Sequence, residues 1–236
     1  SIDLYRGSMT RELPEDVNAR VANQYLCSQE VQREYDMVFI TNPTSLHLDT
    51  AIKFRPFTKA FFIEKPVFSS SDVDDQVIAL LDEILSYVAC PLRYNPVLQY
   101  VKQNVELEEV ISVRAMSSSY LPDWRPGQDY RQTYSAHTEL GGGVDIDLIH
   151  EWDYLTWIFG MPTECLGVAG RFSNLEINSN DTALYVAKND KLTYELHLDY
   201  FGRKTQRTLD IFTQNDTILC DIVGGTVTYL KAGRTL

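Results

Sequence analysis

The sequence predicts a mixed α/β fold in two parts: an incomplete parallel, doubly wound sheet, then an α+β domain with a large open, mostly antiparallel sheet. In the first part, short apolar runs alternate with helical patterns, as in a parallel sheet with crossover helices. In the second part, one amphipathic helix is followed by successive strand patterns separated by turns. We place the domains at residues 1–91 and 92–236.

The elements of the first part follow from apolar runs and helical spacing. Met37–Thr41 is a continuous apolar run of the kind found in buried parallel strands. Residues 72–85 begin with Asp residues, which the helix dipole favours at a helix N-terminus. They continue with Ile78, Leu81 and Ile84 at helical spacing. We expect strands at 1–5, 37–41, 59–64 and 86–90, and helices at 46–54 and 72–85.

The pattern changes after Pro91. A strongly amphipathic helix over residues 147–159 is ended by Gly160 and Pro162. Asn-Asp pairs at 189–190 and 215–216 mark turns. We also expect a helix at 96–103, a loop at 120–127, and strands at 110–117, 164–172, 182–188, 191–201, 207–213, 216–222 and 226–230.

Charge and cysteine usage exclude several classes of protein. The 236 residues carry a formal net charge of −12 and no long Lys/Arg run, so we expect neither nucleic acid nor an anionic membrane as partner. No apolar run approaches the roughly 20 residues of a membrane span. The four cysteines are scattered without a C-x-x-C pair, which favours reduced thiols and a cytoplasmic location.

Two short motifs follow expected strands, where open α/β sheets bind ligands. Glu64-Lys65-Pro66 ends the strand at 59–64, and its lysine is a candidate site residue. Thr41-Asn42-Pro43-Thr44-Ser45-Leu46-His47 follows the strand at 37–41 and opens a helix whose free N–H groups could face a ligand. Taken singly, the first motif more readily indicates a surface lysine paired with Glu64, and the second a capped turn.

The glycine-led segment Gly141-Gly142-Gly143-Val144-Asp145-Ile146-Asp147-Leu148-Ile149-His150 is the strongest candidate. Its glycines permit close backbone approach. Asp147 and His150 are three residues apart, so on one continuous helix they share a face, and a carboxylate beside an imidazole suits a general base. The alternative is an acidic helix start with a satisfied histidine. We expect no metal site, since no H-E-x-x-H pattern occurs.

The loop Tyr120-Leu121-Pro122-Asp123-Trp124-Arg125-Pro126 carries aromatic and guanidinium groups that can stack on and hydrogen-bond a sugar or a cofactor. The alternative is a loop anchored by Trp124 in a satellite core. We expect Trp124 and Arg125 to contact the cofactor, and Tyr120 and Arg93 to reach the substrate.

Together these segments resemble the Gfo/Idh/MocA family, the glucose–fructose oxidoreductase and inositol dehydrogenase superfamily. The resemblance rests on the motifs at 41–47, 64–66 and 141–153, on Trp157-Ile158-Phe159-Gly160, and on their order and spacing. The stretch at 120–131 is similar to the branch associated with nucleotide-sugar and surface-polysaccharide pathways.

The resemblance implies a partial Rossmann domain and a second domain for substrate binding and oligomerisation. It implies a dehydrogenase that moves a hydride between NAD or NADP and a hydroxyl or keto group of a sugar or nucleotide-sugar. Lys65 and His150 would be catalytic, with Asp147 as the acidic partner of the histidine, and all three would meet the substrate. Thr41, Asn42, Pro43, His47, Glu64, Lys65 and Pro66 would border the cofactor. A homo-oligomer, dimer or tetramer, would form through the C-terminal sheet.

Two departures from the family pattern stand out. The usual spacing is Asp-x-x-x-His, whereas Asp147 precedes His150 by three. No G-x-G-x-x-G phosphate loop occurs, and residues 1–5 align with the family's second strand, so we expect an N-terminally incomplete sequence. Arg6, where the family reads the adenine ribose, suits a 2′-phosphate and so NADP, or is a plain exposed turn. The rival hypothesis is a non-catalytic member or fragment acting as a binding, regulatory or oligomerisation module.

Overall fold

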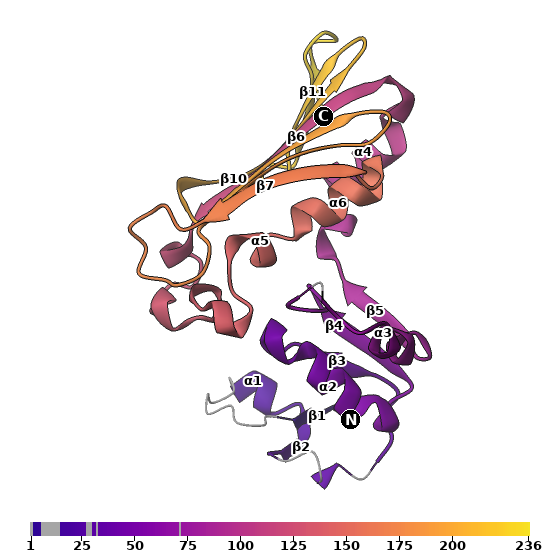
Figure 1. The fold of residues 1–236 in the computed structure, drawn as a ribbon, viewed down its shortest axis with the longest axis vertical. Coiled ribbons are helices and arrows are strands. Elements are labelled where there is room, and N and C mark those ends of the chain that lie inside the picture. Colours follow the sequence, from indigo (N-terminus) through magenta and orange to yellow (C-terminus); the bar gives the residue numbers. More distant parts are fainter. Residues whose placement is uncertain (1, 6–14, 27–29, 32, 71) are drawn as a thin grey trace.

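The computed structural model describes residues 2–5, 15–26, 30–31, 33–70 and 72–236. Figure 1 shows a lower part built from the N-terminal residues and an upper part dominated by one large curved sheet. The fold is mixed α/β, with parallel strands in the first part and mostly antiparallel strands in the second, as the sequence predicts. Within the described residues, no helix has the length and apolarity needed to cross a membrane.

The N-terminal part contains two small parallel sheets. Strands β3, β4 and β5 pair in that order, and β1 pairs with β2, which the sequence pattern did not reveal. Phe61 and Ile63 of β4 are buried with Ile40 of β3, because β4 is the central strand. The elements are β1 (Ile2–Tyr5), α1 (Glu15–Asn18), β2 (Val21–Tyr25), β3 (Val38–Ile40), α2 (His47–Phe54), β4 (Ala60–Glu64), α3 (Asp75–Asp82) and β5 (Leu85–Ala89).

The C-terminal part is an eight-stranded sheet in the order β13-β12-β11-β10-β6-β9-β8-β7. All neighbouring strands are antiparallel except β6 and β9, which are parallel. The strands are β6 (Val110–Tyr120), β7 (Glu164–Gly170), β8 (Thr182–Lys188), β9 (Thr193–Asp199), β10 (Phe201–Thr213), β11 (Thr217–Asp221), β12 (Thr226–Tyr229) and β13 (Arg234–Thr235).

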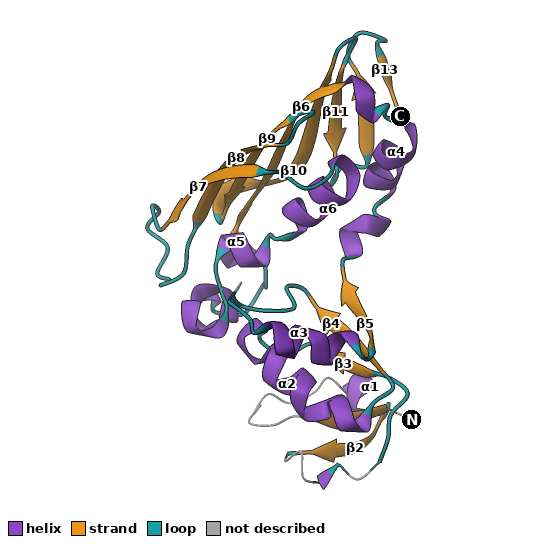
Figure 2. Cartoon of the chain, turned by 45° about the vertical axis from the view of Figure 1, so that its right-hand side comes forward, coloured by secondary structure: helices purple, strands orange, loops and turns teal. Residues whose placement is uncertain are grey.

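The helices α4 (Pro96–Asn104), α5 (Val144–Asp147) and α6 (His150–Phe159) complete this part. Figure 2 shows α5 and α6 against one face of the large sheet. Leu155 of α6 packs in one continuous core with Val113 of β6 and Leu198 of β9, all fully buried. This core holds both α6 and the sheet rigidly, and these two elements form two walls of the cavity described below.

Several predicted elements have different boundaries in the structure, and for two of them a local contact or backbone conformation accounts for the difference. The predicted strand 191–201 ends at Asp199, because the carboxylate of Asp199 accepts the N–H groups of Phe201 and Gly202 and turns the chain into β10. The predicted helix 147–159 is two helices, since α5 ends at Asp147 and Leu148 leaves the helical conformation with φ −97° and ψ 27°.

Candidate active site

A cavity of about 300 Å³ lies where the N-terminal part meets the large sheet. Three kinds of segment form its walls: the turn after β4, the segment from α5 to α6, and strands β6 and β10 with the loop after β6. Its lining includes Lys65, Trp124, Tyr134, Asp147, His150 and Arg207. The lysine and the histidine that sequence reasoning assigned to catalysis therefore face one cavity.

Lys65 directly follows β4, at the carboxyl end of the parallel sheet. Its ammonium donates a hydrogen bond of 2.6 Å to the main-chain carbonyl oxygen of Asp147. Burial lowers the pKa of Lys65, while the carboxylates of Asp147 and Glu64 oppose that shift. The lysine is thus a desolvated hydrogen-bond donor that reaches across from the first part of the chain to the second.

His150 begins α6 and is half-buried. Burial lowers the pKa of its imidazole to about 3, and the positive charges of Lys65 and Arg207 add to the shift. The ring is therefore neutral at physiological pH and has a nitrogen lone pair that can accept a proton.

Asp147 does not form the predicted pair with His150. Because the helix breaks after Asp147, the two residues do not share a face, and the Asp147 carboxylate accepts a 2.6 Å hydrogen bond from the hydroxyl of Tyr200. Tyr134 also lies against this carboxylate, since burial and then the charge of Asp147 raise the pKa of Tyr134 to about 12. Asp147 thus contacts two tyrosines, and its carbonyl holds Lys65.

His47 links the two strand-end motifs of the first part. One ring nitrogen, Nδ1, lies 2.8 Å from the carbonyl oxygen of Pro66, and Nε2 lies 2.8 Å from that of Asn42. The side chain is buried, with 1% exposed. Both nitrogens therefore face protein carbonyls, which leaves neither directed at a cofactor and makes His47 a bridge between the turns after β3 and β4.

The glycine-led segment packs closely against the turn after β3. A Cβ on Gly141, which has φ +78°, would lie 2.9 Å from the Cβ of Thr44 and 3.2 Å from the N of Ser45. A Cβ on Gly142 would lie 2.2 Å from the carbonyl oxygen of Tyr134. These glycines allow the backbones to touch, so the three motifs that carry the family resemblance converge on one region.

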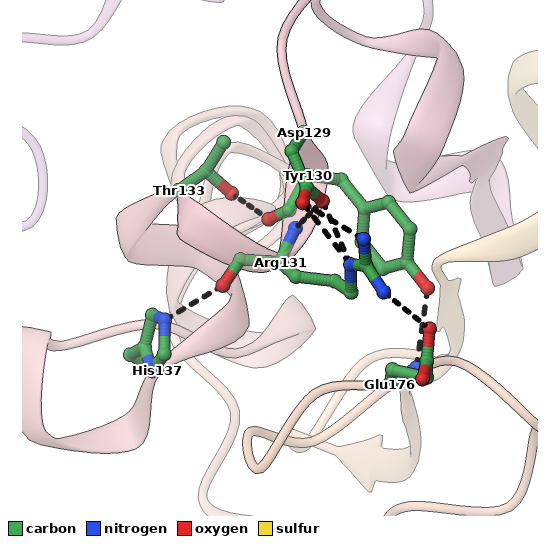
Figure 3. Close-up of polar contacts among 6 residues, drawn as sticks. All are labelled: Asp129, Tyr130, Arg131, Thr133, His137 and Glu176. Atoms are coloured by element: carbon green, nitrogen blue, oxygen red, sulfur yellow. Dashed lines mark hydrogen bonds and ion pairs between the residues drawn. The ribbon is translucent and has the colours of Figure 1, made fainter.

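The loop after β6 forms a further wall and is held by its own network. Trp124 donates a 2.9 Å hydrogen bond from Nε1 to the hydroxyl of Ser119, and its ring meets Tyr200 edge-on. Arg125 stacks on the ring of Tyr134. Figure 3 shows the stretch before the glycines, where Arg131 binds the carboxylates of Asp129 and Glu176.

The remaining residues predicted to bind the cofactor lie outside the lining of this cavity or outside the described residues. Thr41, Asn42, Pro43 and Glu64 lie at the carboxyl ends of β3 and β4, as expected for that edge. The Asn42 Nδ2 donates to Thr50, and its buried Oδ1 has no hydrogen-bond partner among the described residues. Pro66 lines a second, more open hollow with Ile146 and Ile149. Arg6 lies outside the described residues.

Arg93 and Tyr120 do not line the cavity. The guanidinium of Arg93 binds the carboxylate of Asp153 at 2.6 Å, and it lies over the ring of Trp157. The ring of Tyr120 is covered by Arg203, whose guanidinium carbon lies 3.7 Å from the ring centroid. Arg93 thus forms an ion pair with α6 and lies outside the lining of the cavity, and its binding of substrate stays a prediction.

Sequence reasoning missed the residues that the large sheet contributes. Arg207 lines the cavity beside Ser117, Ser119, Thr205 and Gln206. These residues meet because β10 pairs with β6 so that Arg207 lies opposite Ser117. That register depends on a long-range pairing, and the local sequence around Arg207 carries no signal for it. Within the described ranges, no group of three or more His, Cys, Asp or Glu side chains could hold a metal ion.

No family model matches the chain. A curated relative, an uncharacterised oxidoreductase YrbE from Bacillus subtilis (strain 168), is 26% identical over 158 residues, which is 64% of this chain and 44% of the relative. The chain thus spans less than half of the curated relative that it matches.

Solved structures show the likeness in three dimensions. A levoglucosan dehydrogenase in complex with NADH and L-sorbose superimposes with a TM-score of 0.80 at 15% identity, covering 100% of this chain and 71% of that one. The WlbA dehydrogenase from Bordetella pertussis, in complex with NADH and UDP-GlcNAcA, gives 0.74 at 17% identity, covering 87% and 65%.

A UDP-N-acetylglucosamine 3-dehydrogenase, GnnA from Acidithiobacillus ferrooxidans, gives a TM-score of 0.71 at 21% identity, with 90% of this chain and 66% of that chain covered. At such identities the likeness establishes the fold. This chain has the fold of the Gfo/Idh/MocA-type dehydrogenases, as its motifs predict.

Proposed function

We propose that this chain belongs to a nicotinamide-dependent oxidoreductase that interconverts a hydroxyl and a keto group on a sugar or nucleotide-sugar. The observation that carries the proposal is that Lys65 and His150 line one cavity. Lys65 is held there by its 2.6 Å hydrogen bond to the main-chain carbonyl oxygen of Asp147. A neutral imidazole can serve as the general base for an alcohol, and a cation beside it can stabilise the oxyanion that forms.

In the oxidative direction, His150 takes the proton of the substrate hydroxyl. Its lowered pKa keeps the ring unprotonated before the reaction, so a ring nitrogen has a lone pair for that proton. Lys65 donates a hydrogen bond to the same oxygen and stabilises the negative charge that grows on it, since its ammonium is buried in the same cavity. In the reductive direction the steps reverse: Lys65 still donates its hydrogen bond to the oxygen, and the protonated His150 returns the proton to the new alkoxide.

The strand-end residues fit the nicotinamide end of the cofactor. Asn42 has a buried side-chain oxygen with no partner among the described residues, which suits an N–H donor such as a carboxamide. The hollow beside Pro66, of about 330 Å³, is lined mainly by apolar groups that can pack on a planar ring. When bound, the nicotinamide supplies the site that accepts or donates the hydride. Both NAD and NADP stay open, and NADH is the cofactor in the related complexes with WlbA and levoglucosan dehydrogenase.

The substrate class is supported by the same relatives. GnnA is a dehydrogenase of a nucleotide-sugar, and levoglucosan dehydrogenase binds L-sorbose in the structure cited above.

Three free cysteines in the described part of the chain, Cys90, Cys165 and Cys220, suit a reducing cytoplasm.

The outer face of the large sheet supports self-association. On β8, Ala183 and Ala187 point into the core, whereas Leu184 and Val186 point the other way and are exposed. Leu166 and Val168 of β7 pair with Val186 and Leu184, so all four form one apolar surface, which we name the β7–β8 patch. Contiguous exposed apolar surface of this kind marks a protein interface, and we propose that a second copy of the chain covers it.

The test is turnover by the protein with a panel of sugars and nucleotide-sugars, followed through the absorbance of the reduced nicotinamide. Lys65→Met and His150→Gln should each lower kcat by about 10²–10⁴-fold while the circular dichroism spectrum is unchanged. Lys59→Met is the matched control, since Lys59 is an exposed lysine paired with Asp36 at the other end of β4. Unchanged kcat in both cavity variants would refute the assignment.

A further inference from the structure

Arg207 places a guanidinium on the sheet side of the cavity, opposite the turn that carries Lys65. Its Nε donates a 2.6 Å hydrogen bond to Oε1 of Glu151. A guanidinium has five N–H groups, and this contact uses one. Among the described residues, no hydrogen bond engages its two terminal nitrogens, and the side chain keeps 23% of its surface exposed. The remaining N–H groups are therefore available to a ligand.

Glu151 holds that guanidinium from behind. Its side chain has no exposed surface, and its second oxygen, Oε2, has no partner among the described residues. A carboxylate that met both the Nε and a terminal nitrogen of Arg207 would close the fork in the usual two-point pair. Here the contact is one-point, so the terminal edge of the guanidinium remains open while its position is fixed.

Lys65 and Arg207 are the two cations among the described residues that line the cavity, and only Arg207 hydrogen-bonds a carboxylate, that of Glu151, through one nitrogen. Lys65 binds a main-chain carbonyl, and the nearby Asp147 carboxylate accepts its hydrogen bond from Tyr200. Arg207 shares its positive charge with one buried carboxylate through a single bond. Both cations act on His150, whose pKa they lower together with burial. Two side-chain cations thus lie close enough to His150 to act on its imidazole.

The hydroxyl groups near Arg207 add further donors. Ser117 lies opposite it on β6, and Ser119 and Thr205 line the same cavity. A planar guanidinium flanked by hydroxyls matches the oxygens of a carboxylate or a phosphate, which accept several hydrogen bonds at once.

We infer that Arg207 binds an oxyanion carried by the substrate, either the carboxylate of a sugar acid or the diphosphate of a nucleotide-sugar, and that Glu151 is the positioning residue for it. This rests on the proposed function for the statement that the cavity holds the substrate. The binding of the oxyanion itself does not depend on turnover.

The experiment measures binding by isothermal titration calorimetry with four ligands: glucose, glucuronate, UDP-glucose and UDP-glucuronate. Glucuronate differs from glucose by its carboxylate, and UDP-glucose differs from glucose by its diphosphate and nucleoside. The protein should bind at least one of the anionic ligands tenfold or more tightly than glucose. Preference for glucuronate over glucose identifies the carboxylate; preference confined to the two UDP ligands identifies the diphosphate only if it is lost in Arg207→Gln, because the nucleoside is common to both.

Three variants then ask whether Arg207 causes the preference. Arg207→Gln should reduce binding of the preferred anion by tenfold or more, and Arg207→Lys should keep part of it. Because Arg207→Gln leaves Glu151 buried without its cation, the double variant Arg207→Gln/Glu151→Gln removes both charges and serves if the single variant unfolds. Arg203→Gln is the matched control, an exposed arginine of β10 that stacks on Tyr120 outside the cavity.

Two results would overturn the inference: equal binding of all four ligands by the wild-type protein, or a preference that survives in both the single and the double variant. Tight anion binding that depends on Arg207 in a protein with no dehydrogenase turnover would leave the oxyanion site standing and refute the proposed function alone. Turnover of neutral sugars with no dependence on Arg207 would support the proposed function and refute the oxyanion site alone.

Discussion

The ammonium of Lys65 hydrogen-bonds the main-chain carbonyl oxygen of Asp147, a residue 82 positions later in the chain, at 2.6 Å. The partner is a neutral carbonyl, so the bond holds the lysine in place without cancelling its charge. The contact also brings the turn after β4 to the start of the segment that leads into α6. The position of the lysine and the position of the histidine are therefore set by one local arrangement.

The lowered pKa of Lys65 predicts how activity falls at alkaline pH. The ammonium is the hydrogen-bond donor, so kcat/KM should decline as the pH rises through the pKa of Lys65, which burial places below the ordinary lysine value. Lys65→Arg keeps a cation that does not titrate in this range. We expect this variant to be less active than the wild-type protein, but its kcat/KM should not decline at alkaline pH. The measurement is kcat/KM against pH for both proteins, and an identical alkaline limb in the two would exclude Lys65 as its source.

The lowered pKa of His150 predicts a loss of stability in acid. The unfolded chain binds a proton on this histidine below about pH 6.5, whereas the folded ring stays neutral until about pH 3. Folding is therefore opposed increasingly as pH falls from 6.5 toward 3, and the effect is absent above pH 7.

His150→Gln removes this titration. Urea unfolding at pH 7.5 and pH 5 should show a smaller loss of unfolding free energy in the variant than in the wild-type protein. His137→Gln is the comparison, a histidine outside the cavity that bonds the carbonyl of Arg131 (Figure 3). If wild-type and His150→Gln proteins lose equal stability between the two pH values, the imidazole is not kept neutral by the fold.

The bridge made by His47 predicts a coupled loss of stability and turnover. His47→Ala leaves the buried carbonyls of Asn42 and Pro66 without this partner, which should cost about 1–3 kcal/mol per lost buried contact. Because Pro66 follows Lys65, kcat should also fall while KM for the sugar changes little. His47→Gln, which can still donate to one carbonyl, should recover part of both.

Thermal unfolding and steady-state kinetics of these two variants provide the measurement. A stability loss in His47→Ala with kcat unchanged would mean that the bridge supports the fold without positioning the lysine.

The β7–β8 patch predicts association that one charge can break. Val186→Glu puts a carboxylate in the middle of the patch, opposite Leu166 on the neighbouring strand. The mass measured by light scattering after size-exclusion chromatography should fall to that of a single chain. Ile52→Glu, an exposed apolar residue on α2 far from β7, should not change it. A wild-type protein that already has the mass of one chain would contradict the proposal.

Local sequence patterns were enough to predict most strands and the residues at the carboxyl edge of the parallel sheet. The apolar runs at 37–41 and 59–64 predict two neighbouring parallel strands. Because both strands end at the same edge of the sheet, Asn42 and Lys65 lie at that edge regardless of the fold of the other segments. Strand β8 was predicted at its observed bounds, Thr182–Lys188, because the turn at Asn189 marks its end.

The parts that failed depend on contacts between distant residues. Spacing placed Asp147 and His150 on one helical face, but the helix breaks at Leu148, where α5 packs against β8 and β9, and Tyr200 binds the Asp147 carboxylate. Arg207 enters the cavity through the pairing of β10 with β6, which includes a register shift between Phe201 and Gln206. No pattern within either strand encodes that alignment.

The backbone contact at Gly142 limits how this cavity could acquire a new specificity. Its amide donates to the carbonyl of His137, and any larger residue would drive into the carbonyl of Tyr134. The contact leaves no room for a side chain at Gly142, so substitutions that alter the shape of the cavity are better placed at side chains such as Trp124, Ser119 and Gln206. A mutational library meant to retarget the enzyme should therefore vary the sheet and leave the glycines untouched.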